Sequence, residues 1–559
     1  MFLREKKIYN NNQTYTYLQI VESVKKKGKV KQNVLLNFGN ITYWPPEKME
    51  RLIDDLALYT GYHHRGGLSE RDIDPQGTLD YGAHLLLDII WKQLSLDKFW
   101  KRYLSKRVLG FEVEMAIKAM VYNRLTDPKS KLALDEWIKR QYIPGVDPDM
   151  LKVHHYYRAL DVVAESKDEF EEWVYAHITN LLNFDLSLVF YDLTSSYFEG
   201  EGPEIACPGY SRDNRPDCNQ IQIGLLVNSD GIPISHVVFD GAVSDQRTLP
   251  EVISQMLSRF NIKQCIFVAD DGIVNTATMS LVRDAGYKTI YSASMHKEKS
   301  VQDILEQAPE FNSRSSPWKK IKDNLWVWEL PEKIDGYRIT IAFNPIRQKS
   351  QRVKRERWLT ESKSYLNSFN AKTKRGAKKN NQKVEMQIDK WLRRKGTRKY
   401  FEFSRKGPYR LKFSQKESAI QKTSAVDGMM VLRTDSEKLS TAEVALGYRT
   451  LTQVEAAFKE IKDFIKLRPI RHWTDLRVKG HVAVCVMAYL IESILDNLLT
   501  QSKIRMTARR ALGLFSSLTV VKLNLAGKQL YKTTQPTEDQ LELLRIIGLS
   551  KFERILTKT

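Results

Sequence analysis

The chain is poor in cysteine. Its 559 residues include four cysteines, and none of them stands in a C-x-x-C pair. A structural zinc site is therefore not expected. So few thiols in so long a chain also argue against a disulfide framework, and they predict a protein of a reducing cytoplasm.

Long uninterrupted apolar runs are missing as well. The N-terminal residues MFLREKKIYNNNQ contain no apolar core of a signal peptide. The longest apolar stretch, HVAVCVMAYLIESILDNLL, starts at His481 and is broken by Glu492 and Asp496. Because a helix needs about 20 apolar residues to cross a bilayer, we expect a core helix here and no association with a membrane.

Acidic residues are the minority among the charged side chains. The chain has 67 Asp and Glu against 88 Lys and Arg, a formal net charge of +21. A protein this basic usually binds a polyanion, most often nucleic acid, although a merely soluble basic enzyme is the alternative. The excess is greatest from Arg347 to Lys399, with 19 basic residues against four acidic ones. Contact with phosphates and a solvated linker are equally good interpretations of this run.

Hydrophobic periodicity divides the chain into regions, as expected for a length that exceeds one core. Two alternating segments flank the turn KKKGK near the N-terminus and predict a β-hairpin. Residues of about 50–180 follow a helical pattern, in which His154 and His155 are interpreted as helix residues rather than metal ligands. From about 185 the pattern is α/β: three antiparallel strands, then strands reached through helices, an order found in ribonuclease-H-like sheets. Residues of about 296–430 mix strand-like pieces with the basic run, and helices return after Thr441.

Two apolar strands each end in an aspartate. The segment LVFYDLTSSYF contains Asp192, and QCIFVADDGIVN contains Asp270. A carboxylate next to a buried strand has to be capped, paired or bound to a metal. For either residue alone, a turn or helix cap is the more common explanation. As a pair in such a sheet they form a candidate metal site, because Mg²⁺ prefers carboxylate oxygens.

A third carboxylate is predicted on a helix. The segment YRTLTQVEAAFKEIKDFIKLRPIRHW has an apolar face at helical spacing, formed by Val454, Phe458, Ile461 and Ile465. The same spacing, shifted by one residue, places a carboxylate and three ammonium groups on a second face: Glu455, Lys459, Lys462 and Lys466. Tyr448 lies two turns before Glu455. This helix is predicted to hold Glu455 near a metal with its lysines along one groove, and a solvated Glu–Lys ladder is the alternative.

These segments together resemble the DDE transposases of bacterial insertion sequences, within the insertion-sequence-four superfamily and its branch named after insertion sequence 1634. The likeness rests on FYDLTSSYFEG, GYSRDNRPDCNQIQIGLLVNSDGIPI, VADDGIVN and GYRTLTQVEAAFKEIKDFIKLRPIRHW. The superfamily signature Tyr-x₂-Arg-x₃-Glu-x₆-Lys is matched at Tyr448, Glu455 and Lys462, whereas Leu451 stands at the arginine position. Relatives often have Ala-Asp-Arg-Gly where this chain has ADDG, so Asp270 is assigned as the ligand and Asp271 as the departure.

The resemblance covers nearly the whole chain and implies its fold. It implies an α/β protein with a ribonuclease-H-like catalytic core, interrupted by a β-rich insertion between the second aspartate and the glutamate. The interval from Asp270 to Glu455 is 185 residues, against 78 between the aspartates. The domains implied are 1–75 (β-hairpin region), 76–182 (helical, DNA-binding), 183–295 (core, first part), 296–430 (β-rich basic insertion), 431–502 (core, second part) and 503–559 (C-terminal domain).

The resemblance also implies a reaction, cleavage of DNA at the element's ends followed by strand transfer into a target. We expect two Mg²⁺ ions, for which Mn²⁺ can substitute, with Asp192 bridging them, Asp270 holding one and Glu455 the other. Lys462 is expected to grip a phosphate and Tyr448 to contact terminal nucleotides. The other expected DNA contacts are Lys459, Lys466, Arg212, Arg215, Arg468 and Arg471. The partners implied are double-stranded DNA and a second copy in a synaptic homodimer, in the bacterial cytoplasm at the nucleoid.

Other interpretations stay open. The strand ending in YDLTSS is also typical of phosphohydrolases with a nucleophilic aspartate, but these usually carry a second aspartate where this chain has Thr194. A domesticated or inactive relative that only binds DNA is the non-enzymatic alternative. A metal-dependent nuclease without strand transfer is the third.

Overall fold

The computed structural model describes residues 1–10, 13–26, 29–60, 73–181, 187–260, 262, 265–270, 273–293, 299–309, 311, 317–373, 381–406, 410–525 and 528–556. Its backbone contacts divide the chain into two compact units. The first comprises Met1–Leu79, Leu518–Gln535 and Glu553–Lys558, and the second is built mainly from Asp80–Ser517 and Pro536–Phe552. The six domains expected from the sequence remain predictions.

The first unit contains two small antiparallel sheets. One has the order β1-β2-β3, and the other has the order β18-β17-β16-β4. The pairing of β2 with β3 confirms the hairpin predicted around the lysine-rich turn, whose Lys27 and Gly28 lie outside the described residues. The elements of this unit are β1 (Phe2–Asn10), β2 (Gln13–Lys26), β3 (Lys29–Asn40), α1 (Pro46–Thr60), β4 (Ile73–Asp80), β16 (Thr519–Leu525), β17 (Lys528–Thr533) and β18 (Ile555–Leu556).

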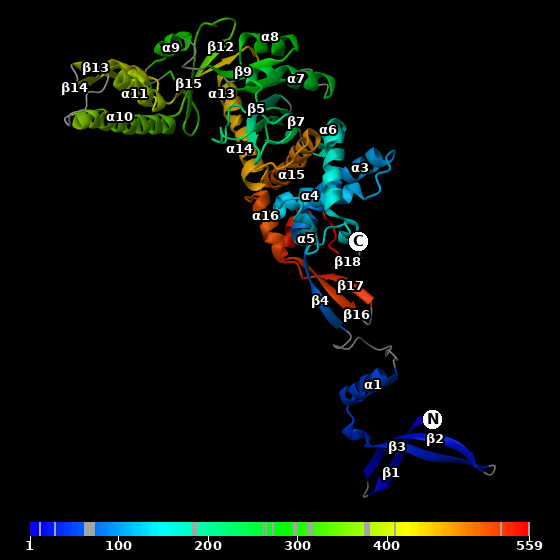
Figure 1. Ribbon diagram of the computed structural model, residues 1–559. Helices are drawn as coiled ribbons and strands as arrows, with labels where there is room; N and C mark the ends of the chain where they lie inside the picture. Colours follow the sequence, from blue (N-terminus) through cyan, green and yellow to red (C-terminus); the bar gives the residue numbers. More distant parts are fainter. Residues whose placement is uncertain are drawn as a thin grey trace. The chain divides into compact units, whose positions relative to one another are not determined.

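A nine-stranded mixed sheet organises the second unit (Figure 1). Its order is β10-β11-β12-β15-β9-β8-β5-β6-β7. Strands β5, β6 and β7 are antiparallel neighbours, whereas β8 and β9 run parallel to β5, as the alternating strand and helix pattern predicts. The strands are β5 (Leu188–Tyr197), β6 (Gln220–Asn228), β7 (Pro233–Asp240), β8 (Ile266–Ala269), β9 (Lys288–Ala293), β10 (Lys319–Lys322), β11 (Leu325–Glu329), β12 (Arg338–Phe343) and β15 (Met429–Thr434).

The tight turn between β6 and β7 follows from its residues. Asn228 Oδ1 accepts hydrogen bonds from the backbone N–H groups of Asp230 at 3.1 Å and Ile232 at 2.9 Å. Gly231 has a φ of +78°, which glycine adopts without steric cost. The predicted Ser-Asp-Gly hairpin is therefore present.

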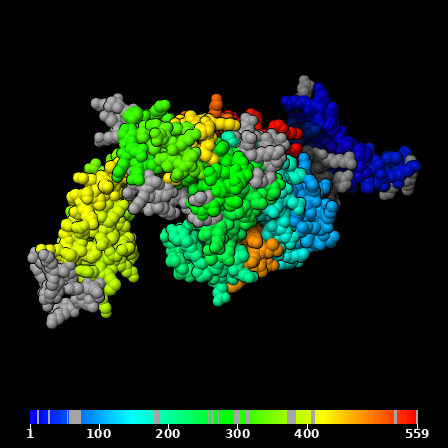
Figure 2. Space-filling view, turned by 90° about the horizontal axis from the view of Figure 1, so that it is seen from above, coloured from blue at the N-terminus to red at the C-terminus, as the bar shows by residue number. Residues whose placement is uncertain are grey.

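The region expected as a β-rich insertion has two parts. Its strands β10, β11, β12 and β15 continue the central sheet. The other part is a largely helical module with its own small core, which includes Leu366, Ile388 and Phe401 and which Figure 2 shows as a distinct lobe. This module consists of α10 (Pro345–Thr373), α11 (Asn381–Arg394), β13 (Phe401–Lys406), β14 (Arg410–Gln415) and α12 (Glu417–Ala425). The insertion is therefore less β-rich than expected.

Helices cover the sheet and form the rest of the second unit. Near the N-terminal side these are α2 (Gly82–Gln93), α3 (Leu96–Leu104), α4 (Val113–Thr126), α5 (Leu134–Ile138) and α6 (Val153–Leu181). The remainder are α7 (Asp245–Ser258), α8 (Thr276–Asp284), α9 (Lys299–Glu306), α13 (Thr441–Thr450), α14 (Thr452–Lys459), α15 (Asp475–Gln501), α16 (Ala508–Leu514) and α17 (Glu538–Ile546). In α6 the ring of His155 stacks on Phe111 at 4.8 Å, so this histidine packs as expected.

Helix α15 is the central helix of the second unit. In the described part of the chain it alone is long and apolar enough to cross a membrane, but 83% of its most apolar window is buried inside the protein. It lies beside α6 (Figure 1), where Gly480 faces the backbone of Leu160 so closely that an added Cβ would stand 2.1 Å from the carbonyl oxygen. The segment from His481 is thus a core helix, as its two acidic residues predict.

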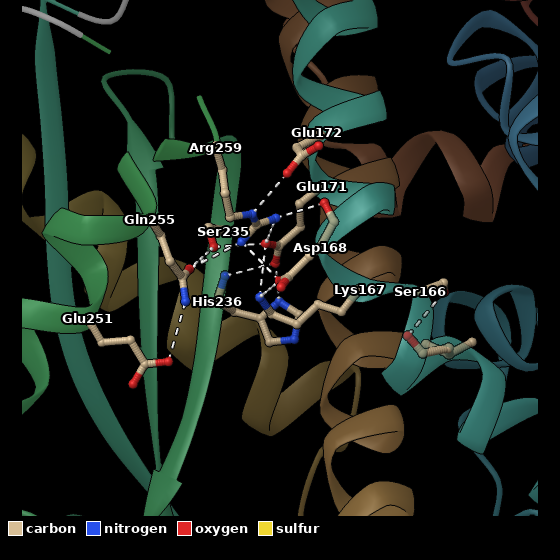
Figure 3. Close-up of polar contacts among 11 residues, drawn as sticks. Ser166, Lys167, Asp168, Glu171, Glu172, Ser235, His236, Glu251, Gln255 and Arg259 are labelled. Atoms are coloured by element: carbon tan, nitrogen blue, oxygen red, sulfur yellow. Dashed lines mark hydrogen bonds and ion pairs between the residues drawn. The ribbon is translucent and has the colours of Figure 1, made fainter. Parts of the chain in front are cut away.

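A buried cluster of charges joins α6 to the sheet (Figure 3). Glu171 accepts hydrogen bonds from the Ser235 hydroxyl at 2.9 Å and the His236 backbone N–H at 3.0 Å. Lys167 and Arg259 each place a nitrogen 3.0 Å from Glu171 Oε2. Although burial favours the neutral acid, these partners outweigh it and hold the pKa of the Glu171 carboxyl well below its ordinary value of 4.5. The cluster therefore fastens α6 to β7 and α7 through a charged carboxylate.

This cluster predicts that acid weakens the fold. The depressed pKa of Glu171 contributes stability that is complete above pH 4.5 and is lost as the pH falls further. Burial also lowers the pKa of His236 below 6.5, so protonation of the unfolded chain removes further stability under that pH. The Glu171→Gln variant is expected to lose about 3 kcal/mol of stability at pH 7, because Lys167 and Arg259 then lose their buried partner and keep only exposed carboxylates. Melting temperatures should differ most at pH 7, and the difference should shrink below pH 4.5.

The matched control is Glu172→Gln, the neighbouring and half-exposed ion-pair partner of Arg259. It is expected to cost less than about 1 kcal/mol, since exposed ion pairs contribute little. Besides Glu171, Glu172 and His236, the charged groups of this cluster are Lys167, Asp168 and Arg259. Equal melting temperatures for the two variants at pH 7 would contradict a structural role for the buried carboxylate.

Candidate active site

The two aspartates are brought together by strand register. Strands β5 and β8 are parallel neighbours in which Phe190 is paired with Val268. Asp192 and Asp270 each lie two residues further on, so both stand at the same level and on the same face of the sheet. Strand β8 ends at Ala269, whereas β5 continues to Tyr197. Asp192 therefore lies within its strand rather than at the strand's end.

The environment of Asp192 disfavours its negative charge. Burial raises the pKa of its carboxyl to about 7, and the charges of Asp270 and Glu455 raise it too. A 2.7 Å hydrogen bond from the Leu193 backbone N–H and the charge of Arg212 act in the opposite direction. The three carboxylates predicted from the sequence are thus electrostatic neighbours.

Asp270 is oriented by two hydroxyl groups. Tyr448 and Ser292 each donate a hydrogen bond of 3.1 Å to its Oδ1. Asp270, Tyr448 and Glu455 line one groove with a volume of about 410 Å³. The signature tyrosine therefore contacts the second aspartate directly, which the sequence did not predict.

Glu455 reaches the groove from a broken helix. The predicted single helix consists of α13 and α14, which meet at the buried Leu451, and a π-helical turn, η5 (Glu460–Phe464). Val454 and Phe458 are buried, and α14 packs on β5 and β6, which leaves Glu455 exposed above the sheet. The apolar face was predicted correctly.

The shared face predicted for the three lysines is wrong beyond α14. A π-turn contains more residues than an α-turn, so it shifts the spacing after Lys459. Lys459 and Lys466 are exposed, but Lys466 follows the helix with a φ of +54°. Lys462 is buried, with a side chain only 9% exposed. Its side chain therefore points inward rather than along an open groove.

A buried acidic residue that sequence reasoning missed holds this turn. The side chain of Asp213 is 4% exposed, and its Oδ1 lies 2.8 Å from Lys462 Nζ. The same atom contacts Arg468, which also pairs with Asp463 at 2.9 Å. Burial lowers the pKa of the Lys462 ammonium, and the bond to Asp213 opposes this. Any phosphate contact by Lys462 has to compete with this carboxylate.

The other arginines expected to contact DNA are also paired within the protein. Arg212 binds Asp245 at 2.7 Å, Arg215 binds Asp217 at 2.8 Å, and Arg471 binds Glu199 at 2.6 Å. Their expected DNA contacts remain predictions. Asp271, the departure from the family pattern, lies outside the described residues.

The carboxylates fit a hard divalent cation by their chemistry. All three donors are oxygens, which suit a hard cation, and burial together with the charges of Asp270 and Glu455 raises the pKa of Asp192. Among the described residues, no three His, Cys, Asp or Glu side chains converge on one point. The assignment of Asp192, Asp270 and Glu455 as ligands therefore rests on their chemistry and register.

Two family models match the chain. Residues 3–61 match the N-terminal domain of IS1634 family transposases, and residues 183–491 match the transposase DDE domain. The second match spans more than half of the chain and includes all three carboxylates. No curated protein matches the chain.

Solved structures show only distant similarity. A cryo-EM structure of the piggyBac transposase synaptic complex with hairpin DNA is 10% identical, with 78% of this chain and 80% of that chain covered and a TM-score of 0.35. A crystal structure of the Mos1 mariner paired end complex with Mn is 11% identical, with 44% of this chain and 78% of that chain covered and a TM-score of 0.14. Scores this low do not define a common fold.

Proposed function

Because the chain belongs to the IS1634 family of DDE transposases, we propose that it binds the two ends of its own insertion sequence and moves that element by metal-dependent cleavage and strand transfer, in a cut-and-paste reaction. The substrates are double-stranded DNA ends and a double-stranded target. Because two ends have to be joined, the working form is a homodimer in a synaptic complex.

One observation carries this proposal. The register of β5 and β8 aligns Asp192 with Asp270, and Glu455 of α14 lines the groove with Asp270 and acts electrostatically on Asp192. The five strands from β5 to β9 have the order of a ribonuclease-H-like core, which we propose as the catalytic core. Three carboxylates at one edge of such a sheet suit a site for divalent cations next to a phosphodiester.

Residues of the protein itself would hold the metal ions and orient the groups around them. Asp192, Asp270 and Glu455 would hold two Mg²⁺ ions, or Mn²⁺ in their place. Bound there, the ions would supply Lewis acidity that stabilises charge developing on the phosphoryl oxygens. The Tyr448 hydroxyl keeps the Asp270 carboxylate turned toward the groove, and its ring stands where a terminal nucleotide would lie. Asp213 fixes Lys462 and Arg468 behind the helix that carries Glu455.

The test uses purified full-length protein and DNA carrying the ends that flank its own gene. We expect cleavage at those ends and joining to a second DNA when Mg²⁺ is present, and neither reaction in EDTA. Manganese should restore both reactions after the protein has been stripped of metal. Excess salt should release the DNA, because each neutralised phosphate contributes a slope of about −0.9 to log K against log salt.

The products separate the alternatives. Cleavage without joining would favour a nuclease, and end binding without cleavage in either metal would favour a relative that only binds DNA. Both outcomes would contradict the proposed reaction. Inverted repeats flanking the gene, bounded by a target duplication, would independently support a mobile element.

A further inference from the structure

Two arginines line the groove that Asp270 and Glu455 share. Arg347 comes from the first turn of α10 and Arg449 from the last turn of α13. They share this groove with Asp270, Tyr448 and Glu455. Both arginines are exposed, so their guanidinium groups are accessible to a ligand in the groove.

These two arginines differ from those singled out by the sequence motifs. The earlier candidates Arg212, Arg215, Arg468 and Arg471 all pair with an acidic residue of the chain. Within the part of the chain that the structure describes, the guanidinium groups of Arg347 and Arg449 form no ion pair and no side-chain hydrogen bond. Their charge is therefore available to an anion from outside the protein.

The positive charge of Arg347 does not stabilise the helix that carries it. A cation in the first turn of a helix is unfavourable, because the N-terminal end of the helix dipole is positive. That turn is held firmly: Asn344 Oδ1 accepts from the backbone N–H groups of Ile346 at 2.9 Å and Arg347 at 3.1 Å. The helix start and the guanidinium thus add positive potential at one end of the groove, which suits a phosphate.

The presence of leucine at position 451 makes the positive charges of Arg347 and Arg449 more important to the groove. Leu451 stands where the superfamily signature has arginine, and it is 7% exposed, so it brings no charge to the groove it lines. Arg449 is two residues away, and Arg347 enters from the helical module of the insertion. Positive charge in the groove therefore comes from residues outside the signature.

We propose that Arg347 and Arg449 form a phosphate clamp that holds the DNA backbone next to the carboxylates, an inference that rests on the proposed function. The planar guanidinium fork binds a phosphodiester through two parallel hydrogen bonds, which positions the strand as well as attracting it. The helical module of the insertion then contributes directly to the substrate site. Both arginines are positioning residues, since they act on a neighbouring phosphate and leave the reacting atoms to the carboxylates.

Binding of the DNA ends in EDTA tests the clamp without the metal. The Arg347→Gln variant is expected to bind about tenfold more weakly, because hydrogen bonds to charged groups are the strong ones. Its salt slope should fall by about 0.9 for the phosphate contact it loses. Arg449→Gln should act in the same way, and the double variant should lose both contacts. Melting temperatures equal to that of the parent would confirm that each variant folds.

The matched control is Lys349→Gln, which removes the same charge from the same helix two residues along. Lys349 is exposed and is not among the residues that line the groove. Its loss should weaken binding less than Arg347→Gln does. Neutral methylphosphonate linkages placed one at a time in the DNA end identify the phosphate: the linkage that weakens the parent should have little effect on Arg347→Gln.

The outcomes separate this inference from the proposed function. If Arg347→Gln and Lys349→Gln bind equally and every methylphosphonate weakens both to the same extent, the clamp is overturned while cleavage by the parent still stands. If the parent neither binds nor cleaves the ends, the proposed function fails and the clamp fails with it.

Discussion

The Asp192→Asn variant is expected to cleave its DNA ends at least about 1,000-fold more slowly than the parent, while binding them as tightly. Removing one group that stabilises charge in a phosphoryl-transfer site costs on this order. Asparagine keeps the size of the side chain and its hydrogen bond from Leu193, but it carries no charge for a cation. The Glu455→Gln variant should also cleave about 1,000-fold more slowly while it binds the DNA ends as tightly. The measurement is single-turnover cleavage beside a gel-shift titration.

The control for these variants is Asp323→Asn. Asp323 is 91% exposed in the turn between β10 and β11, and it pairs only with Lys320 among the described residues. Its cleavage rate should stay within about twofold of the parent, as expected for an exposed ion pair. Cleavage that survives in both Asp192→Asn and Glu455→Gln would mean that other residues form the catalytic site. Equal loss in Asp323→Asn would indicate a general effect of charge.

A second large effect is expected on stability, from Gly480→Ala in α15. The added methyl group would stand 2.1 Å from the Leu160 carbonyl oxygen, so α15 and α6 would have to separate. Overpacking against backbone costs about 3 kcal/mol or more. We expect a lower melting temperature, together with faster hydrogen exchange in peptides from both helices.

Gly513→Ala in α16 is the matched control. A Cβ at this position meets no atom within 4 Å, and alanine favours helix formation. Its melting temperature should change little or rise slightly. If Gly480→Ala is as stable as Gly513→Ala, the two long helices do not pack as closely as the structure shows.

The sequence signals for the three candidate carboxylates are local, and their assignment as the site stays a prediction. An apolar run followed by aspartate marks β5 and β8, and parallel pairing then aligns Asp192 with Asp270 without further information. The helical spacing of Val454 and Phe458 predicts the helix, whereas the choice of Glu455 as a ligand rested on the two aspartates and on the family resemblance. The central strands and the core helix at His481 were predictable because their signals are local as well.

The features that escaped prediction depend on distant partners. Asp213 lies 249 residues from Lys462 and 255 from Arg468, so no local pattern marks it as the centre of a buried cluster. The π-turn after Lys459 changes a periodicity that the sequence presents as regular. In α10 the buried Leu359 and Leu366 are masked by the surrounding lysines and arginines, and Arg355 is buried through its 2.7 Å bond to Asp427. The sequence therefore indicated only a run of charges in this segment, whereas the structure forms helix α10 there.

The continuity of the central sheet affects the order in which the three carboxylates can assemble while the chain is being synthesised. Helix α13 packs on β9, β11, β12 and β15, so these later strands support the helix that leads into α14 and Glu455. A nascent or truncated chain that ends before β15 holds both aspartates, but it lacks Glu455 and part of the surface on which α13 packs. The three carboxylates can therefore come together only after more than three quarters of the polypeptide has been made.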